Sequence, residues 1–154
     1  MKITAYDLAL RFVGTAEVPG RMANPLIMAM LNLDAEWPED DEVPWCSGAV
    51  NFVCWLLRLP RSKSLRARSW LNVGRPIKLS DARPGWDIVI FKRGPDPQPG
   101  PDVIDAPGHV AFFGGLESDK VWSLGGNQSD EFKLSQYPAM DVIGVRRLYE
   151  GEAA

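Results

Sequence analysis

Apolar residues in the first half of the chain recur at the spacing of an α-helix. The pattern predicts four helical segments, at residues 6–13, 25–33, 46–58 and 64–72. Thr4 is placed to cap the first segment, which ends at Gly14, and Asn24-Pro25 is an N-cap followed by proline at the first helical position. The third segment has its apolar positions at Val50, Val53, Cys54 and Leu57.

The second half changes to β-branched and aromatic runs punctuated by glycine. These runs predict strands at residues 86–91, 109–115, 120–126 and 142–149. A stretch rich in proline, glycine and aspartate, residues 94–108, predicts a long loop between the first two strands. Helices first and strands later predict an α+β fold with an antiparallel sheet, in one domain of residues 1–154.

Composition and charge argue against nucleic acid and membranes as binding partners. The formal net charge of −3 gives no basic surface for nucleic acid, so we expect no nucleic-acid partner. The longest apolar runs, such as LIMAMLNL, are far too short to span a membrane. The N-terminus has no apolar signal-peptide region, so we expect synthesis in the cytoplasm and export by another route.

The two cysteines, Cys46 and Cys54, lie on one predicted helix. Their Cα atoms would be separated by roughly 12 Å along its axis, which is beyond disulfide reach. Two cysteines and a single histidine also make a structural zinc site an unfavourable interpretation. We therefore expect two free thiols and no cofactor.

Cys46 is the candidate nucleophile because it starts a predicted helix directly after Pro44-Trp45. Unpaired N–H groups and the helix dipole at such a position stabilise a thiolate, and the same N–H groups can bind an oxyanion. The alternative is that Cys46 is a small buried apolar residue. Cys54 lies in mid-helix among apolar neighbours and is interpreted as core.

His109, the only histidine, begins a predicted strand directly after Pro107-Gly108. Asn127 lies at the end of the next strand, and a hairpin of residues 109–115 and 120–126 makes the two residues nearly opposite. An imidazole base needs a third group to fix its tautomer, and Asn127 is the candidate. Taken alone, His109 would be interpreted as a surface or core residue, and Asn127 as a turn residue. Their combination with Cys46 favours a Cys–His hydrolase.

Five motifs in order carry a family resemblance: PWCSGAVNFVCW, SLRARSWL, GWDIVIFKRG, GHVAFFGG and LGGNQSD. Together they resemble the CHAP and NlpC-type cysteine peptidases, from residues 16–20 to residues 143–149. The chain is most similar in layout to the short single-domain peptidoglycan hydrolases of bacteria and phages.

The resemblance implies a papain-like fold with Cys46 as nucleophile, His109 as base and Asn127 as polar third residue. Many CHAP members carry a glutamate two residues before that asparagine, where this chain has Gly125. It also implies cleavage of an amide bond in peptidoglycan, and we favour an endopeptidase over an N-acetylmuramoyl-L-alanine amidase.

Several biological roles are consistent with such an enzyme. We expect a monomeric phage or prophage endolysin that reaches the cell wall of the periplasm through a holin-dependent route. The alternatives are a secreted antibacterial amidase effector with an immunity protein, and a non-catalytic wall-binding module of the same fold. A protein deamidase or an ordinary protease would share the chemistry on another substrate.

Charged and aromatic segments beside the motifs leave further alternatives. Residues 34–42 are strongly acidic and suit calcium, but they lack a recognisable ligand spacing, so we expect no metal. The basic segment 58–83, including Arg66 and Arg68, is the predicted electrostatic partner of this acidic run. Trp45 and Trp70 could wall a substrate groove, although packing under the active-site helix is the more common role.

Overall fold

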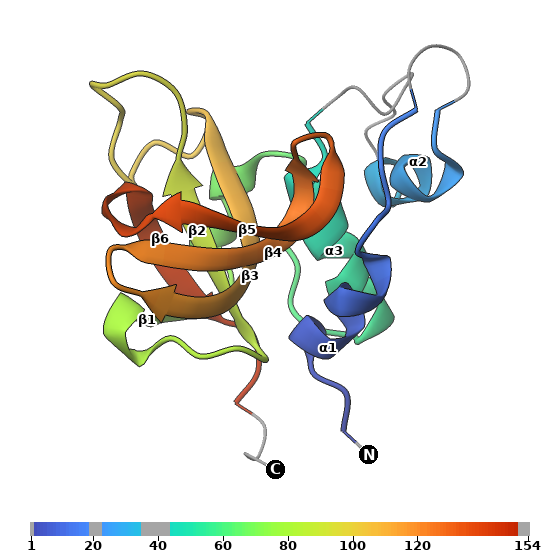
Figure 1. Cartoon of the computed structure of the whole chain (residues 1–154), viewed down its shortest axis with the longest axis horizontal. Helices are drawn as coiled ribbons and strands as arrows, with labels where there is room; N and C mark the ends of the chain where they lie inside the picture. The colour runs from blue at the N-terminus through green and yellow to red at the C-terminus, as the bar shows by residue number, and fades with distance from the viewer. Residues whose placement is uncertain (1, 19–22, 35–43, 151–154) are drawn as a thin grey trace.

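The computed structural model describes residues 2–18, 23–34 and 44–150. Its α-helices all lie in the first half of the chain, as predicted (Figure 1). They are α1 (Ala5–Ala9), continued by a 3₁₀ turn, then α2 (Pro25–Leu31) and α3 (Cys46–Leu56). Thr4 caps α1 in a capping box with Asp7, and the Asn24 side chain caps α2.

The second half forms one antiparallel sheet of six strands in the order β1-β6-β2-β3-β4-β5. The strands are β1 (Arg75–Ile77), β2 (Asp87–Lys92), β3 (Gly108–Glu117), β4 (Lys120–Gln128), β5 (Glu131–Pro138) and β6 (Val142–Arg147). The predicted α+β class is therefore confirmed. The fold places N-terminal helices against a C-terminal antiparallel sheet.

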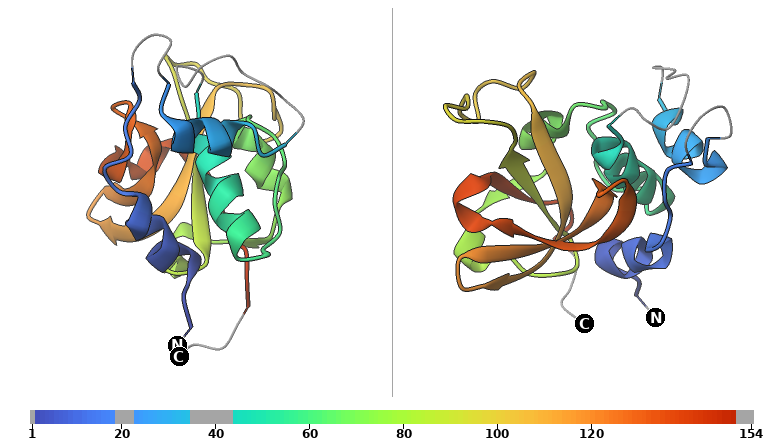
Figure 2. Two further views of the ribbon diagram at one scale, coloured as in Figure 1. Left: turned by 90° about the vertical axis from the view of Figure 1, so that its right-hand side faces the viewer. Right: turned by 45° about the horizontal axis from the view of Figure 1, so that its top comes forward.

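The central strands are buried on both faces, which explains their unbroken apolar runs. Ile90 and Phe112 belong to the larger core, between the sheet and α3. Phe91 and Phe113, the next residues along the same two strands, belong to a second core on the other face. Figure 2 shows the three helices gathered on one side of the curved sheet. Successive residues of β2 and β3 can thus face either the helices or the second core.

Some predicted elements differ from the observed ones. Strands β1 and β5 were not predicted, because β1 is three residues long and contains Pro76, while β5 mixes polar and apolar side chains. The fourth predicted helix is a 3₁₀ helix, η2 (Ala67–Asn72). The expected long loop between β2 and β3 spans residues 93–107, since Gly108 already belongs to β3.

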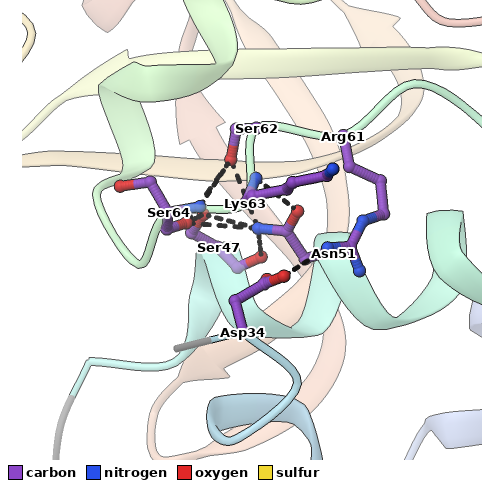
Figure 3. Close-up of polar contacts among 7 residues, drawn as sticks. All are labelled: Asp34, Ser47, Asn51, Arg61, Ser62, Lys63 and Ser64. Carbon is purple, nitrogen blue, oxygen red and sulfur yellow. Dashed lines mark hydrogen bonds and ion pairs between the residues drawn. The ribbon is translucent and has the colours of Figure 1, made fainter. Parts of the chain in front are cut away.

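The acidic segment is only partly described. Asp34 forms an ion pair with Arg61, and the remaining acidic positions of residues 35–42 lie outside the described residues (Figure 3). Within the described ranges, no three His, Cys, Asp or Glu side chains gather as metal ligands would. The same ranges contain no helix with the length and apolar character that crossing a membrane requires.

Candidate active site

Cys46 is the first residue of α3 and is 2% exposed. No side chain among the described residues caps the start of this helix, so its first N–H groups are free to face the sulfur or an oxyanion. The preceding residue, Trp45, packs so closely against Gly126 of β4 that a Cβ atom there would overlap the indole ring. Glycine at this position lets the start of α3 approach the sheet.

A buried polar network fixes the first turns of α3 (Figure 3). Ser47 Oγ donates a hydrogen bond to the Ser64 carbonyl and accepts one from the indole N–H of Trp70, at 2.9 Å. The Asn51 amide donates to Ser62 Oγ and to the Ser64 carbonyl, and its oxygen accepts from the backbone N–H of Lys63. The helix that carries Cys46 is thereby tied to residues 62–64 through satisfied buried hydrogen bonds.

His109 lies at the start of β3, as predicted, and is 4% exposed. Its ring centroid lies 5.0 Å from that of Tyr137 on β5 and 6.1 Å from that of Phe91 on β2. The two aromatic rings also pack on each other, at 5.1 Å. The imidazole is therefore held by three strands, and its position depends on packing as well as on hydrogen bonds.

Gln128 is the residue that orients the imidazole. His109 Nε2 lies 2.9 Å from Gln128 Oε1, and the Gln128 amide nitrogen donates to the carbonyls of Ser123 and Lys133. Two backbone carbonyls can only accept, so they hold the amide with its oxygen toward the ring. His109 Nε2 must then carry the proton in the neutral ring, which leaves Nδ1 as the basic nitrogen.

Asn127 was predicted as the orienting residue, but in the structure the adjacent Gln128 makes the hydrogen bond to the imidazole. The predicted register is close to the observed one, in which Phe112 pairs with Leu124. However, Asn127 has a φ of 57° and lies in a register shift between β4 and β5. The left-handed residue breaks the alternation of side chains, so Gln128 reaches the ring instead. Asn127 lines the neighbouring pocket.

The helix that begins at Cys46, α3, packs against β3, the strand that carries His109. The backbone N–H of Val110, next to His109, lowers the pKa of the Cys46 thiol, as do those of Ser47 and Cys46 itself. No direct hydrogen bond joins the thiol to the imidazole in this structure, although both belong to the described residues. Catalytic hydrogen bonds of unliganded enzymes commonly shorten only when substrate binds.

Burial controls the protonation of the pair. It raises the pKa of the Cys46 thiol, against which the three backbone N–H groups and the charge of Arg93 act in the opposite direction. Burial also lowers the pKa of His109 to about 4, although the hydrogen bond with Gln128 partly opposes this shift. The expected thiolate is therefore not the resting form. At neutral pH the pair is a thiol beside a neutral imidazole, and His109 can act as a general base.

Cys54 has the surroundings predicted for a core residue. It is fully buried in the larger core, and burial raises its pKa to about 12. Both cysteines are free, as expected from their spacing.

A pocket of about 390 Å³ opens beside the imidazole. Its lining includes His109, Tyr137, Arg93 and Asp141, but not Cys46. A larger cavity of about 1020 Å³ lies at the other end of α3, around Trp55, and contains none of the predicted catalytic residues. The smaller pocket is the better candidate for substrate, because it touches the imidazole.

Arg68 has a different role from the one predicted. It is fully buried rather than available to the acidic segment. Its guanidinium donates to four backbone carbonyls of the loop before His109, those of Pro99, Gly100, Val103 and Pro107. Arg68 also packs against Gly108, where a Cβ atom would lie 2.9 Å from Arg68 Cγ. It thus holds the loop that delivers His109 to the site.

Trp45 and Trp70 are both fully buried, so they support the start of α3 and do not wall a groove. Sequence reasoning missed Gln128 and Tyr137. The amide of Gln128 follows Asn127 directly, and the alternation in EFKLSQY could have shown the strand that carries Tyr137.

Comparison with solved structures identifies the architecture as an NlpC-like, papain-type fold. NlpC2 from Trichomonas vaginalis superposes with a TM-score of 0.56 at 16% identity, over 96% of this chain and 46% of that one. NlpC1 from the same organism gives a TM-score of 0.53 at 16% identity, over 94% of this chain and 42% of that one. The chain thus spans less than half the length of either structure. No family model and no curated protein matches the sequence.

Proposed function

We propose that this chain is a cysteine hydrolase that cleaves an amide bond in the peptide part of peptidoglycan. The observation that carries the proposal is the hydrogen bond between His109 Nε2 and Gln128, which leaves Nδ1 as a base on β3, the strand that packs against the helix of Cys46. The NlpC-like fold supports a cysteine hydrolase, and the sequence motifs support the wall as substrate.

The chemistry begins with transfer of the Cys46 proton to His109 Nδ1 as the sulfur attacks the scissile carbonyl carbon. The resulting oxyanion accepts hydrogen bonds from backbone N–H groups at the uncapped start of α3. His109 then gives the proton to the leaving nitrogen, the C–N bond breaks, and a thioester remains on Cys46. Water adds to the thioester with His109 as base, and cleavage of the C–S bond restores the thiol.

Gln128 is a positioning residue in this scheme. Its oxygen accepts the Nε2–H hydrogen bond in both the neutral and the charged ring, so the imidazole keeps one orientation throughout the cycle. No step requires a cofactor.

Digestion of purified sacculi tests the proposal. The wild-type protein should release muropeptides, and mass spectrometry of the new termini should reveal a cut amide bond, with an endopeptidase product expected over an amidase product. Cys46→Ala should release none while keeping its circular dichroism spectrum. Digestion by Cys46→Ala at the wild-type rate would refute the mechanism. Binding to sacculi without digestion by the wild type would favour the wall-binding module.

The endolysin role, the monomeric state and release to the periplasm stay predictions. A neighbouring holin gene supports the endolysin, whereas a neighbouring immunity gene supports the secreted effector.

A further inference from the structure

The cavity of about 1020 Å³ lies at the C-terminal end of α3, whereas Cys46 starts the helix. Trp55 and Leu56, in the last turn, line this cavity, and both are exposed, Trp55 to 52%. Trp55 follows Cys46 by nine positions, which corresponds to roughly 13 Å along the helix axis. A ligand in the Trp55 cavity would therefore leave the catalytic position free.

Two exposed cations line the same cavity. Arg58 and Lys63 form no ion pair and no side-chain hydrogen bond with any described residue. The third cation, Arg61, is already paired with Asp34, which is the only acid among the described residues of the lining. The Trp55 cavity thus has positive charge without a partner in the described part of the chain, which suits an anionic ligand.

Both unpaired cations occupy backbone positions that favour glycine. Arg58 has a φ of 57° and Lys63 a φ of 56°. In the turn that ends α3, the N–H of Arg58 donates to the Trp55 carbonyl. The N–H of Leu59 donates to the Cys54 carbonyl, which completes a Schellman motif, whose left-handed position is usually glycine. The helix dipole favours a cation at position 58, but Lys63 lies beyond the helix, so left-handed cations at both positions indicate that the side chains have a function.

The segment that carries Lys63 is anchored to α3 (Figure 3). The side-chain oxygen of Asn51 accepts a hydrogen bond from the Lys63 N–H at 3.0 Å, and the Asn51 amide donates to Ser62 Oγ. The ion pair between Arg61 and Asp34 links the same segment to the chain that follows α2. The cations are therefore presented by backbone that is ordered before a ligand binds, which lowers the entropic cost of binding.

We propose that the Trp55 cavity is a second, non-catalytic binding site for a carboxylated glycan strand of the cell wall, with a sugar ring against Trp55 and carboxylates at Arg58 and Lys63. The choice of the wall glycan rests on the proposed function. A half-exposed indole offers apolar area to the C–H face of a sugar ring. A guanidinium binds a carboxylate through two parallel hydrogen bonds, and an ammonium adds a point charge. The concave shape fits a saccharide better than the surface of a bilayer.

Contacts at both ends of α3 would hold a polymeric substrate at two points. Once one contact has formed, the other becomes intramolecular, so a strand bound in the Trp55 cavity raises the local concentration of the scissile bond at Cys46. A short soluble substrate gains nothing from the second site. Loss of the cavity should therefore slow digestion of intact sacculi and leave cleavage of a short soluble muropeptide within about twofold.

Co-sedimentation with purified sacculi tests the site in the full chain carrying Cys46→Ala, in which digestion cannot follow binding. In that background Trp55→Ala should raise the protein concentration at half-saturation by roughly 5- to 20-fold. Arg58→Gly combined with Lys63→Gly should raise it by roughly 3- to 10-fold, and salt at about 0.5 M should shrink this difference. Because glycine suits both backbone positions, the double variant removes charge without adding strain.

Leu116→Ala and Lys120→Gln are the matched controls. Leu116 is an exposed apolar residue and Lys120 an exposed cation, and neither is among the described residues that line the cavity. Each control should change half-saturation by less than about twofold.

Soluble saccharides test the chemistry of the ligand. Removal of the stem peptides by an amidase leaves glycan strands with free lactyl carboxylates, and N-acetylchitooligosaccharides provide a similar backbone without charge. The carboxylated strands should bind the Cys46→Ala protein more tightly than the neutral ones. This preference should disappear in the variant that also carries Arg58→Gly and Lys63→Gly.

Parental binding by Trp55→Ala, equal losses in the controls, or no binding by the Cys46→Ala parent overturns the inference. Equal affinity for charged and neutral strands overturns it too, as does binding to phosphatidylglycerol vesicles but not to glycan strands. Binding that depends on Trp55, in a protein whose wild type digests no sacculi, would retain the cavity and reject the hydrolase. Digestion by a wild type whose binding does not depend on Trp55 would retain the hydrolase and reject the cavity.

Discussion

The two cysteines of α3 show how one helix can hold two buried thiols in different chemical settings. Cys54 is enclosed by the core, and burial raises its pKa to about 12. Cys46 is also buried, but three backbone N–H groups and the charge of Arg93 lower its pKa against the effect of burial. Helix position supplies the N–H groups of Cys46 and Ser47, because the first turn of a helix has N–H groups without helical partners, and β3 supplies that of Val110. Burial has the largest effect on the pKa of both thiols, and the local donors distinguish Cys46 from Cys54.

Exchanging each thiol in turn should give the largest contrast. Cys46→Ser should lower the rate of wall digestion by at least roughly 1000-fold, because serine is a much weaker nucleophile beside a neutral imidazole. Cys54→Ser should keep the rate within about threefold and destabilise the fold by about 1–3 kcal/mol, because it buries a hydroxyl. Turbidity of sacculi and chemical denaturation measure the two effects. Loss of activity in Cys54→Ser alone would reverse the assignment.

The two adjacent amide side chains at the end of β4, Asn127 and Gln128, provide the next contrast. Gln128→Ala should lower the rate by roughly 10- to 1000-fold, since it removes the acceptor for His109 Nε2. Asn127→Ala should stay within about threefold, because Asn127 does not bond the ring. Equal losses in both variants would argue against Gln128 as the orienting residue.

Gln128→Glu refines the same test. A carboxylate beside Nε2 favours the imidazolium and raises the pKa of His109. Since His109 must be neutral to accept the thiol proton, the acidic limb of the pH–rate profile should move to higher pH. A move of the alkaline limb to higher pH, with the acidic limb unchanged, would instead indicate that the charged ring is the active form.

Stability should depend on pH through His109. Its pKa falls from 6.5 to about 4 on folding. Between these two pH values the unfolded chain therefore binds a proton that the folded protein does not bind. The stabilisation is present above pH 6.5 and is lost as the pH falls toward 4, by about 3 kcal/mol in total. Denaturation at several pH values should show this slope in wild type and in Cys54→Ser, and a flatter one in His109→Phe. An NMR titration of His109 near pH 6.5 would contradict it.

The smallest effect is expected in the middle of α3. Asn51→Ala removes the hydrogen bonds to residues 62–64 and should destabilise the protein by about 1–3 kcal/mol, because buried partners lose their donors and acceptor. Ser62→Ala, which removes one bond of the network, should cost less. Thermal denaturation measures both, and equal midpoints for wild type and Asn51→Ala would show that the network is not stabilising.

The sequence predicted the class of fold and placed Cys46 and His109 on the observed elements, because periodicity and glycine punctuation are local signals. Cys46 starts α3, and His109 lies at the start of β3. Both positions follow from the residues immediately around them.

Features that depend on tertiary contacts were not predictable. The change from Asn127 to Gln128 arises from one left-handed residue, which no simple alternation anticipates. The burial of Arg68 depends on carbonyls of an irregular loop, and burial of the site lowers the pKa of His109 far below its ordinary value. Each of these three features depends on contacts between segments that are distant in the sequence and come together only in the folded protein.

The position of β6 has a consequence for biosynthesis. This strand lies between β1 and β2 in the sheet, although residues 93–141 separate it from β2 in the chain and a longer segment separates it from β1. A nascent chain emerges from its N-terminus, so β2 presents an open edge until residues 142–147 have left the ribosome. The helix bearing Cys46 is made early, but the strand that completes its supporting sheet is made late. A nascent chain of this design would order the surroundings of Cys46 and His109 only after β6 has been made, and the open edge of β2 is where incomplete chains would associate.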